Sequence, residues 1–543
     1  MKGSLIAPLF FLAVALACLG SRLGAVAPWA AAAVSLAAAA WAGTEVRRAI
    51  TWFSLPVLAY GALIVLNTLL LSPAYTPAGL YQPLLLIGAF AAARSLTEHA
   101  ERAAARAVLG LGLVLAAWGL VQIGPLGMAR AQAVFETPAT YAAFLNLLLV
   151  PVTAAVLLGK RGVPLFSVAL ALAAAVFAAD SRGGLLALTA GFGVAAIFAM
   201  RATQLRARSV GVALGLLAAG WIAAAALRTL PSPETEATPS VSARAESSLS
   251  RLELYALSWN AWRERPLVGT GYLTFRYALE QGRSKVPSYG EANETWLVHN
   301  DYLQTLQELG PLGLLAFLGM TLLPLLLAWR KLPSLAHGQE LPVVAATAAL
   351  AAMSVHALVD FPFYIPACLL LYGASLGALE RRLGGQAALP AWRPRPWHRP
   401  LRAAALAIAA LIMLRPLVAE AAAEWGLRQS AAGESQSAAF WLGAAQRLDP
   451  AEWRYHWYSG QFWDAQAGQS GKREAARLAA EAYAAGFAAN SLEVRNLLGK
   501  ISVHRRHRAL LDSPADSRTL QDWLAQANAL APLNPAVLRE VAR

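Results

Sequence analysis

The chain has 543 residues, of which 57% are hydrophobic and only 14% are charged, and its mean hydropathy is +0.48. This balance excludes a water-soluble globular protein, and repeated apolar runs of about 16 to 22 residues indicate an all-α, polytopic membrane protein. Only two cysteines are present, Cys18 and Cys368, and both lie in apolar runs. A disulfide framework and a thiolate metal site are therefore excluded as well.

The apolar runs predict about 12 to 13 transmembrane helices. The candidate spans are residues 4–20, 24–43, 50–71, 79–94, 105–124, 138–159, 162–179, 183–200, 209–227, 304–328, 341–359, 361–379 and 401–418. We interpret the first run as a retained helix, since it lacks a basic leading segment and more spans follow at once. The expected organisation is nine spans in residues 1–227, a polar loop at 228–303, four spans in 304–419 and a helical domain at 420–543.

Lysine and arginine gather in alternate loops, for example Arg47 with Arg48 and Arg381 with Arg382. The short loops on the other side carry only Arg22, Arg130 and Arg182. Basic loops stay cytoplasmic, so residues 228–303 and the C-terminal domain are predicted to be periplasmic, on the outer side of a bacterial inner membrane. The net charge of +14 is then mainly an orientation signal, and nucleic-acid binding is disfavoured.

The two polar regions have different character. In the loop, residues 231–250 are rich in Pro, Ser, Thr and Glu and are expected to stay mobile, whereas the aromatic residues and arginines of 251–263 predict an interfacial helix. In the C-terminal domain, two helices are expected to end in the similar segments AAQRLDP (444–450) and ALAPLNP (529–535). They favour equally a degenerate tetratricopeptide (TPR-like) repeat and an unclassified helical cap.

Residues 299–313, HNDYLQTLQELGPLG, stand where the polar loop gives way to an apolar run. A titratable histidine at a membrane surface is costly to retain without a role, which makes His299 the leading candidate for chemistry. On position alone, however, a histidine beside a helix start is more often a structural or solvated residue.

The residues of this segment carry a family resemblance. His299 and Asn300, nine further residues, and GPLG at 310–313 resemble the HN-x9-GxxG signature of the bacterial O-antigen ligase and polymerase superfamily, which includes Wzy-type polysaccharide polymerases and protein O-oligosaccharyltransferases. Three other segments resemble parts of that family: 180–188 (DSRGGLLAL), 250–272 (SRLELYALSWNAWRERPLVGTGY) and 356–367 (HALVDFPFYIPA). Residues 134–144 (VFETPATYAAF) depart from it, because an asparagine-containing turn is replaced.

The resemblance implies transfer of a glycan from undecaprenyl pyrophosphate to an acceptor hydroxyl at the extracytoplasmic face. His299 would be the base, since an imidazole titrates near neutral pH. Arg182 and Arg251 would bind the pyrophosphate, with Arg130 as a third candidate. Each arginine has an alternative reading as a lipid-headgroup anchor. Asn300, Asp301 and Tyr364 are possible supporting or acceptor-binding residues, and His356 and Asp360 are expected to lie near each other.

Three acceptors remain open: the lipid A core for a ligase, another lipid-linked glycan for a polymerase, and Ser or Thr of a protein for an oligosaccharyltransferase. No cofactor, nucleotide or metal is expected. The alternatives from other classes are a polysaccharide transporter or flippase without catalysis, and a scaffold acting through the C-terminal domain. Transporters tend to carry ionisable residues at mid-membrane and internal repeats, and neither pattern is evident in this sequence.

Overall fold

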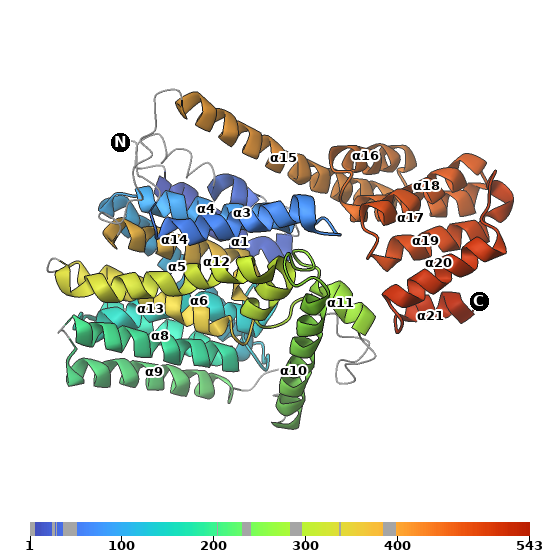
Figure 1. The fold of residues 1–543 in the computed structure, drawn as a ribbon. Coiled ribbons are helices and arrows are strands. Elements are labelled where there is room, and N and C mark those ends of the chain that lie inside the picture. The colour runs from blue at the N-terminus through green and yellow to red at the C-terminus, as the bar shows by residue number, and fades with distance from the viewer. Residues whose placement is uncertain are drawn as a thin grey trace.

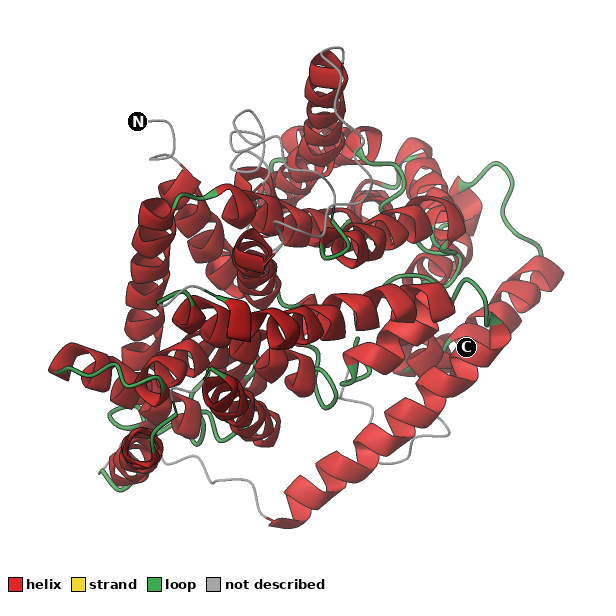
Figure 2. Ribbon diagram, turned by 60° about the vertical axis from the view of Figure 1, so that its left-hand side comes forward, coloured by secondary structure: helices red, strands yellow, loops and turns green. Residues whose placement is uncertain are grey.

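The computed structural model describes residues 6–23, 28, 30–35, 51–202, 205–230, 241–282, 296–335, 338–383 and 398–542. Within these ranges the regular elements are helices joined by loops, as Figure 2 shows. The helices of the apolar region are α1 (Ile6–Leu23), α3 (Ser54–Leu66), α4 (Ala78–Ser95), α5 (Glu98–Ile123), α6 (Pro138–Leu157), α7 (Val163–Ala178), α8 (Arg182–Arg201), α9 (Ala207–Leu227), α12 (Asp301–Lys331), α13 (Glu340–His356) and α14 (Pro366–Leu383). The predicted all-α class is therefore confirmed.

Six helical segments of the described residues are long and apolar enough to cross a membrane, which makes this a multi-pass membrane protein. They are Ser54–Leu71, Glu98–Ile123, Pro138–Leu157, Arg182–Arg201, Ala207–Leu227 and Asp301–Ser334, and three shorter apolar helices are Pro8–Cys18, Val163–Ala178 and Glu340–His356. All nine coincide with predicted spans, and α4 and α14 coincide with two more. The predicted span 24–43 lies largely outside the described residues, so the total of 12 to 13 stays a prediction.

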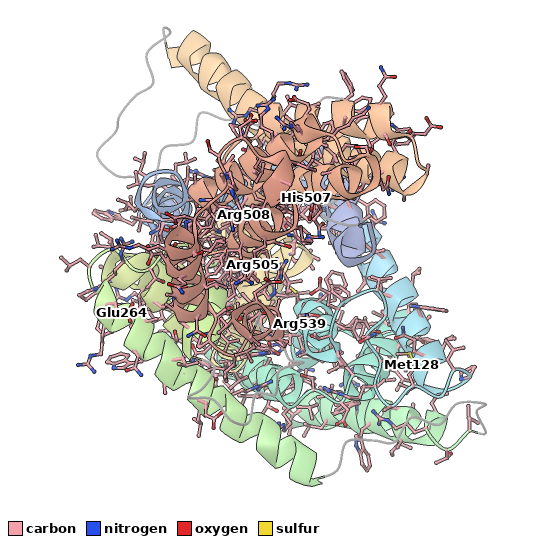
Figure 3. All side chains as sticks on the ribbon, turned by 90° about the vertical axis from the view of Figure 1, so that its right-hand side faces the viewer. Met128, Glu264, Arg505, His507, Arg508 and Arg539 are labelled. Atoms are coloured by element: carbon pink, nitrogen blue, oxygen red, sulfur yellow. The ribbon has the colours of Figure 1, made fainter. Side chains whose placement is uncertain are left out.

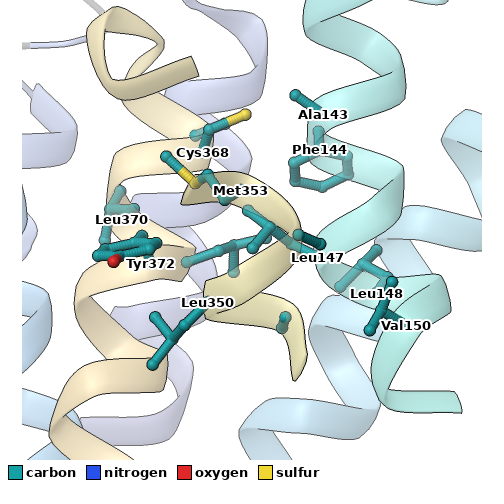
Figure 4. Close-up of a cluster of buried hydrophobic side chains, with 14 of the residues drawn as sticks. Ala143, Phe144, Leu147, Leu148, Val150, Leu350, Met353, Cys368, Leu370 and Tyr372 are labelled. Carbon is teal, nitrogen blue, oxygen red and sulfur yellow. The ribbon is translucent and has the colours of Figure 1, made fainter. Parts of the chain in front are cut away.

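Helix α6 forms the centre of the apolar bundle, and 89% of its most apolar stretch is buried. Its side chains, including Phe144 and Leu147, pack toward Met353 of α13, and Tyr372 of α14 lies in the same cluster (Figure 4). Neighbouring helices approach closely at small residues: a Cβ on Gly377 would lie 2.2 Å from the Phe90 carbonyl oxygen of α4. Close packing through small residues is how apolar helices associate where no water is present to drive them together.

The remaining helices are α10 (Val241–Glu264) and α11 (Phe275–Gly282), then α15 (His398–Ala431), α16 (Ser435–Leu448), α17 (Trp453–Ser470), α18 (Arg473–Ala489), α19 (Val494–Arg506), α20 (Ser517–Leu530) and α21 (Pro535–Ala542). Figure 1 shows α16 to α21 gathered at one end of the apolar bundle. Figure 3 looks at that end, with Arg505, Arg508 and Arg539 on its surface. Successive helices from α15 to α21 pack on one another, and whether they form a TPR-like repeat stays a prediction.

One local prediction is wrong. The helix expected at 251–263 begins at Val241, so residues 241–250 are helical and do not form the mobile segment expected there. Alternating Ala, Arg, Glu and Ser residues are acceptable helix formers once the segment continues from a packed helix. Residues 231–240, the rest of that expected segment, lie outside the described residues.

Candidate active site

The ends of three helices meet at His299. Asn300 caps α12 by accepting a hydrogen bond from the Leu303 backbone N–H at 3.0 Å, and the Asp301 N–H donates to the Ala357 carbonyl at the end of α13 over 2.8 Å. The first turn of α8 lies against the same end of α13, because a Cβ on Gly183 would be 3.0 Å from His356 Nε2. The turns before α8 and α12, far apart in sequence, therefore share one end of the bundle.

The backbone of His299 is held in an unusual conformation. Its φ is +60°, a left-handed value that residues with a side chain adopt uncommonly. The Tyr255 hydroxyl of α10 donates a hydrogen bond to the His299 carbonyl oxygen at 3.0 Å. Conformations of this kind persist where the surroundings fix them, and they concentrate at functional sites. Helix α10 thus helps to aim the imidazole.

The imidazole of His299 is oriented by a buried carboxylate. His299 Nδ1 lies 3.2 Å from Asp360 Oδ1, and the Phe361 N–H donates to the same oxygen at 3.0 Å. His356 Nε2 is 3.8 Å from Asp360 Oδ2, so the expected neighbourhood of His356 and Asp360 is present. Burial raises the pKa of Asp360, but the contacts with His299 and His356 outweigh it, and the net effect is a pKa below its usual range.

This geometry assigns the tautomer of His299. An ionised carboxylate only accepts hydrogen bonds, so Nδ1 must carry the proton that faces Asp360. Nε2 is then the ring nitrogen with a lone pair available to accept a proton. The His299 side chain is 20% exposed and its ring packs edge-on against Phe361, with ring centroids 4.8 Å apart. A buried carboxylate that orients a partly exposed imidazole is the arrangement of a general base.

Two of the three predicted arginines stand on helices that contact the surroundings of His299. Arg182 is the first residue of α8, after the N-cap Ser181, and is exposed next to Gly183. Arg251 lies one helical turn before Tyr255 on α10. Burial raises the pKa of Tyr255, and the nearby guanidinium of Arg251 partly offsets that rise, which locates Arg251 beside the tyrosine that contacts His299.

Arg130 is engaged with the backbone of the turn before α8. Its Nε donates to the Ala179 carbonyl at 3.2 Å, and its Nη2 donates to the Asp180 carbonyl at 2.9 Å. Asp180 has a φ of +45°, another left-handed residue at this end of the bundle. Arg130 therefore braces the turn that presents Arg182, and its direct contact with a phosphate stays a prediction.

Two of the other predicted residues, Asp301 and Tyr364, are buried and form polar contacts. Asp301 is fully buried and its Oδ2 accepts from the Phe363 N–H at 3.0 Å. The Tyr364 hydroxyl donates to Glu308 Oε2 at 2.9 Å, and its ring stacks on Tyr272 with centroids 5.6 Å apart. Asp301 and Tyr364 thus hold the 361–364 segment against α12, which is a supporting role. Sequence reasoning missed Glu308 and Tyr272.

Two of the segments that resemble the family contact each other: the loop of residues 266–271 (PLVGTG) and the break in α12 at Gly310. Helix α12 is interrupted at Gly310, with φ +71° and ψ −172°. The interruption frees the carbonyls of Gln307 and Glu308, which accept from the N–H groups of Thr270 (2.8 Å) and Gly271 (3.1 Å). A Cβ on Gly310 would lie 2.3 Å from the Leu267 carbonyl oxygen. The PLVGTG loop therefore packs directly on the break in α12, and this contact fixes the loop beside the site.

Among the described residues, no group of three or more His, Cys, Asp and Glu side chains is arranged to hold a metal ion. Phe361, which contacts His299, also lines a cavity of about 530 Å³. The chemistry available at the site is proton acceptance by an oriented imidazole, with the exposed Arg182 at the N-terminus of α8 on the same end of the bundle.

Residues 166–318 match the family model described as O-antigen ligase. The chain carries an O-antigen ligase domain. The matched range begins in α7 and ends in α12, so it includes Arg182, Arg251, His299 and the break at Gly310. Asp360 lies outside the O-antigen ligase domain as matched, although its carboxylate contacts His299. A search of curated proteins gave no match for this chain.

Proposed function

We propose that the protein is a membrane glycosyltransferase that moves a glycan from undecaprenyl pyrophosphate to an acceptor hydroxyl at the extracytoplasmic face. The observation that carries the proposal is the contact of His299 Nδ1 with Asp360 at 3.2 Å, in which the histidine belongs to the matched O-antigen ligase range 166–318 and the carboxylate lies beyond it. It leaves Nε2 of a partly exposed imidazole as the base.

The reaction needs one proton acceptor and one anion-stabilising group. His299 Nε2 takes the proton from the acceptor hydroxyl as its oxygen attacks the anomeric carbon of the donor sugar. The bond between that carbon and the pyrophosphate oxygen breaks, and undecaprenyl pyrophosphate leaves with the electron pair. The transferred proton then resides on His299, whose imidazolium is stabilised by Asp360, until it is lost to solvent or to the pyrophosphate.

The leaving pyrophosphate is the most negative group in the reaction, and Arg182 and Arg251 are proposed to bind it. Guanidinium groups stay charged and form paired hydrogen bonds with phosphate oxygens. Arg182 also stands at the N-terminus of α8, where the helix dipole favours an anion. Replacement of either arginine by lysine would keep the charge but lose the paired geometry.

The test compares His299→Ala with His99→Ala, a control at an exposed histidine of α5. Each full-length variant is reconstituted into liposomes with an undecaprenyl-pyrophosphate-linked glycan and with extracted lipopolysaccharide core, lipid-linked glycan or membrane protein as acceptor. We expect transfer to fall about 10²- to 10⁴-fold in His299→Ala, the usual contribution of a general base, and to be normal in His99→Ala. Transfer by His299→Ala within twofold of wild type would refute the proposed base.

The same assay separates the acceptors, because the mass of the product shows whether the glycan ends on lipid A core, on another glycan or on protein. It also separates catalysis from transport. A flippase would move the donor across the bilayer and form no new glycosidic bond when the donor is supplied on the outer side.

A further inference from the structure

The cavity of about 530 Å³ lies where the apolar bundle, the loop region and the C-terminal helices come together. Its wall includes Tyr75 and Tyr81 near the start of α4, Arg276 of α11, Trp296, and the segment Glu452–Arg454 at the start of α17. Its volume is within the range of roughly 300 to 1,000 Å³ that is typical of small-ligand sites. The reaction proposed above gives no role to the residues of this wall that belong to the start of α17.

Buried polar contacts hold the C-terminal helices against the other residues that line the cavity. Asn490 Nδ2 donates to the Tyr277 hydroxyl at 2.6 Å, and Asn490 also forms an isolated backbone bridge with Ala74. Arg276 pairs with Glu493 at 3.3 Å, with both side chains largely buried. These contacts fix the α18–α19 turn against the loop, and Asn496 Nδ2 of α19 donates to the Trp453 carbonyl at 3.4 Å, so Trp453 is a built part of the cavity wall.

Flat aromatic faces gather around one arginine at this wall. The Arg276 guanidinium lies 4.6 Å from the ring centroid of Trp296 and 5.5 Å from that of Trp453. Trp296 is 49% exposed, whereas Trp453 is 3% exposed. The exposed ring of Trp296 offers a large apolar face with little loss of conformational entropy on binding, and Trp453, which also has the Arg495 guanidinium 5.6 Å from its ring centroid, is a fixed aromatic part of the wall. The apolar C–H face of a pyranose ring is complementary to such surfaces.

The charges of the cavity favour a neutral, hydroxyl-rich ligand. The charged residues of its described lining are two acids and two bases: Glu136, Glu452, Arg276 and Arg454. Both arginines are already paired, Arg276 with Glu493 and Arg454 with Glu452 at 2.9 Å. A free pyrophosphate would meet no excess of positive charge here. Sugar hydroxyls, which both donate and accept, match this mixture of carboxylates, guanidiniums and tyrosine hydroxyls.

We propose that this cavity binds sugar residues of the glycan that is transferred, and that Trp453 of the C-terminal domain helps to select which sugars fit. This inference rests on the proposed function in one respect, which is that the ligand is the glycan of the proposed reaction. The sugars can belong to the donor or to the acceptor, since the chemistry of recognition is the same.

Direct binding tests this site without requiring turnover. The full-length protein in detergent is titrated by calorimetry with two soluble probes: the oligosaccharide released by mild acid from the producing strain's lipid-linked glycan, and the core oligosaccharide of its lipopolysaccharide. The probe that binds identifies the source of the sugars. We expect Trp453→Ala to weaken binding about tenfold, in line with the loss of one aromatic contact, and Trp453→Phe to retain most of the affinity.

Two further variants keep the test decisive. Trp296→Ala removes the exposed ring that contacts Arg276 and is expected to weaken binding even if Trp453→Ala fails to fold. Trp425→Ala, at a 48% exposed tryptophan of α15 outside the cavity lining, is the matched control and should bind as wild type does. His299→Ala should also bind normally, so loss of catalysis and loss of sugar binding are separable. Binding of neither probe, or equal binding by wild type and both cavity variants, would overturn the proposal.

Discussion

Gly310→Ala tests whether the contact between the α12 break and the PLVGTG loop supports the site. The φ and ψ of Gly310, +71° and −172°, belong to a region that is almost exclusive to glycine, and a side chain there costs about 1–3 kcal/mol. The new Cβ would also lie 2.3 Å from the Leu267 carbonyl oxygen, a backbone atom that cannot rotate away. Relief of that overlap would separate the loop from α12.

Separation would remove the hydrogen bonds from Thr270 and Gly271 to the carbonyls of α12, each worth about 0.5–1.5 kcal/mol. Together with the backbone cost, the docked loop would lose about 2–6 kcal/mol, which is roughly a 30-fold to 10⁴-fold change in its docking equilibrium. We expect a lower midpoint of thermal unfolding in detergent and at least tenfold slower glycan transfer.

The control for this prediction is Gly193→Ala. Gly193 lies inside α8 and a Cβ there would meet no atom within 4 Å. Alanine is favoured over glycine in a helix by about 1 kcal/mol, so this variant should be at least as stable as wild type. If Gly310→Ala matched both Gly193→Ala and wild type in unfolding midpoint and in transfer rate, the argument that this contact positions the site would fail.

Three further predictions concern the groups around the site and the C-terminal domain. Tyr255→Phe removes the hydrogen bond to the His299 carbonyl and should slow transfer about threefold to tenfold, measured in the liposome assay. Asp360 has a lowered pKa in the folded protein, so its ionised form stabilises the fold at any pH above the usual carboxyl pKa of about 3.9. Asp360→Asn should therefore have a lower unfolding midpoint than wild type at pH 7. This difference in midpoint should shrink only as the pH falls below about 4. Burial, then the charge of Glu452, raises the pKa of Asp449 to about 6. Some stability of the fold is therefore lost as the pH rises through that value. Asp449→Asn should unfold at a higher midpoint than wild type at pH 8 and should show no such advantage at pH 4. An unchanged rate, or midpoint differences independent of pH, would contradict the respective prediction.

The helices of the apolar bundle could be predicted closely from the sequence. Residues 183–200 and 209–227 were expected as spans, and the structure has α8 at Arg182–Arg201 and α9 at Ala207–Leu227. In a bilayer every backbone polar group must find its partner within the segment, so a long apolar run has little alternative to a helix. The start of α10 was mispredicted because composition, which was the only signal used there, is weaker than the tertiary contacts of a continuing helix.

The site was predicted only in part, because its partners come from distant segments. His299, Arg182 and Arg251 stand in recognisable motifs, but Asp360 is 61 residues from His299 and was expected beside His356 alone. Gly269 and Gly310 stand in two segments that resemble the family, yet no local pattern shows that these segments touch. The four-residue spacing of His356 and Asp360 was the one available signal that this carboxylate belongs to a histidine cluster.

The two proposals together order the parts of a bound donor along the site. Positive charge is found at Arg182 and the N-terminus of α8, on the side where Gly183 contacts His356. The cavity with balanced charge is bordered by Phe361, whose ring also contacts His299. A donor with its pyrophosphate at the arginines and its sugars in the cavity would therefore bring the anomeric carbon between the two, next to Phe361. Under both proposals, His299 Nε2 would be the group that takes the proton from the incoming hydroxyl at that point, so a single bound donor would use the base, the cations and the sugar site together.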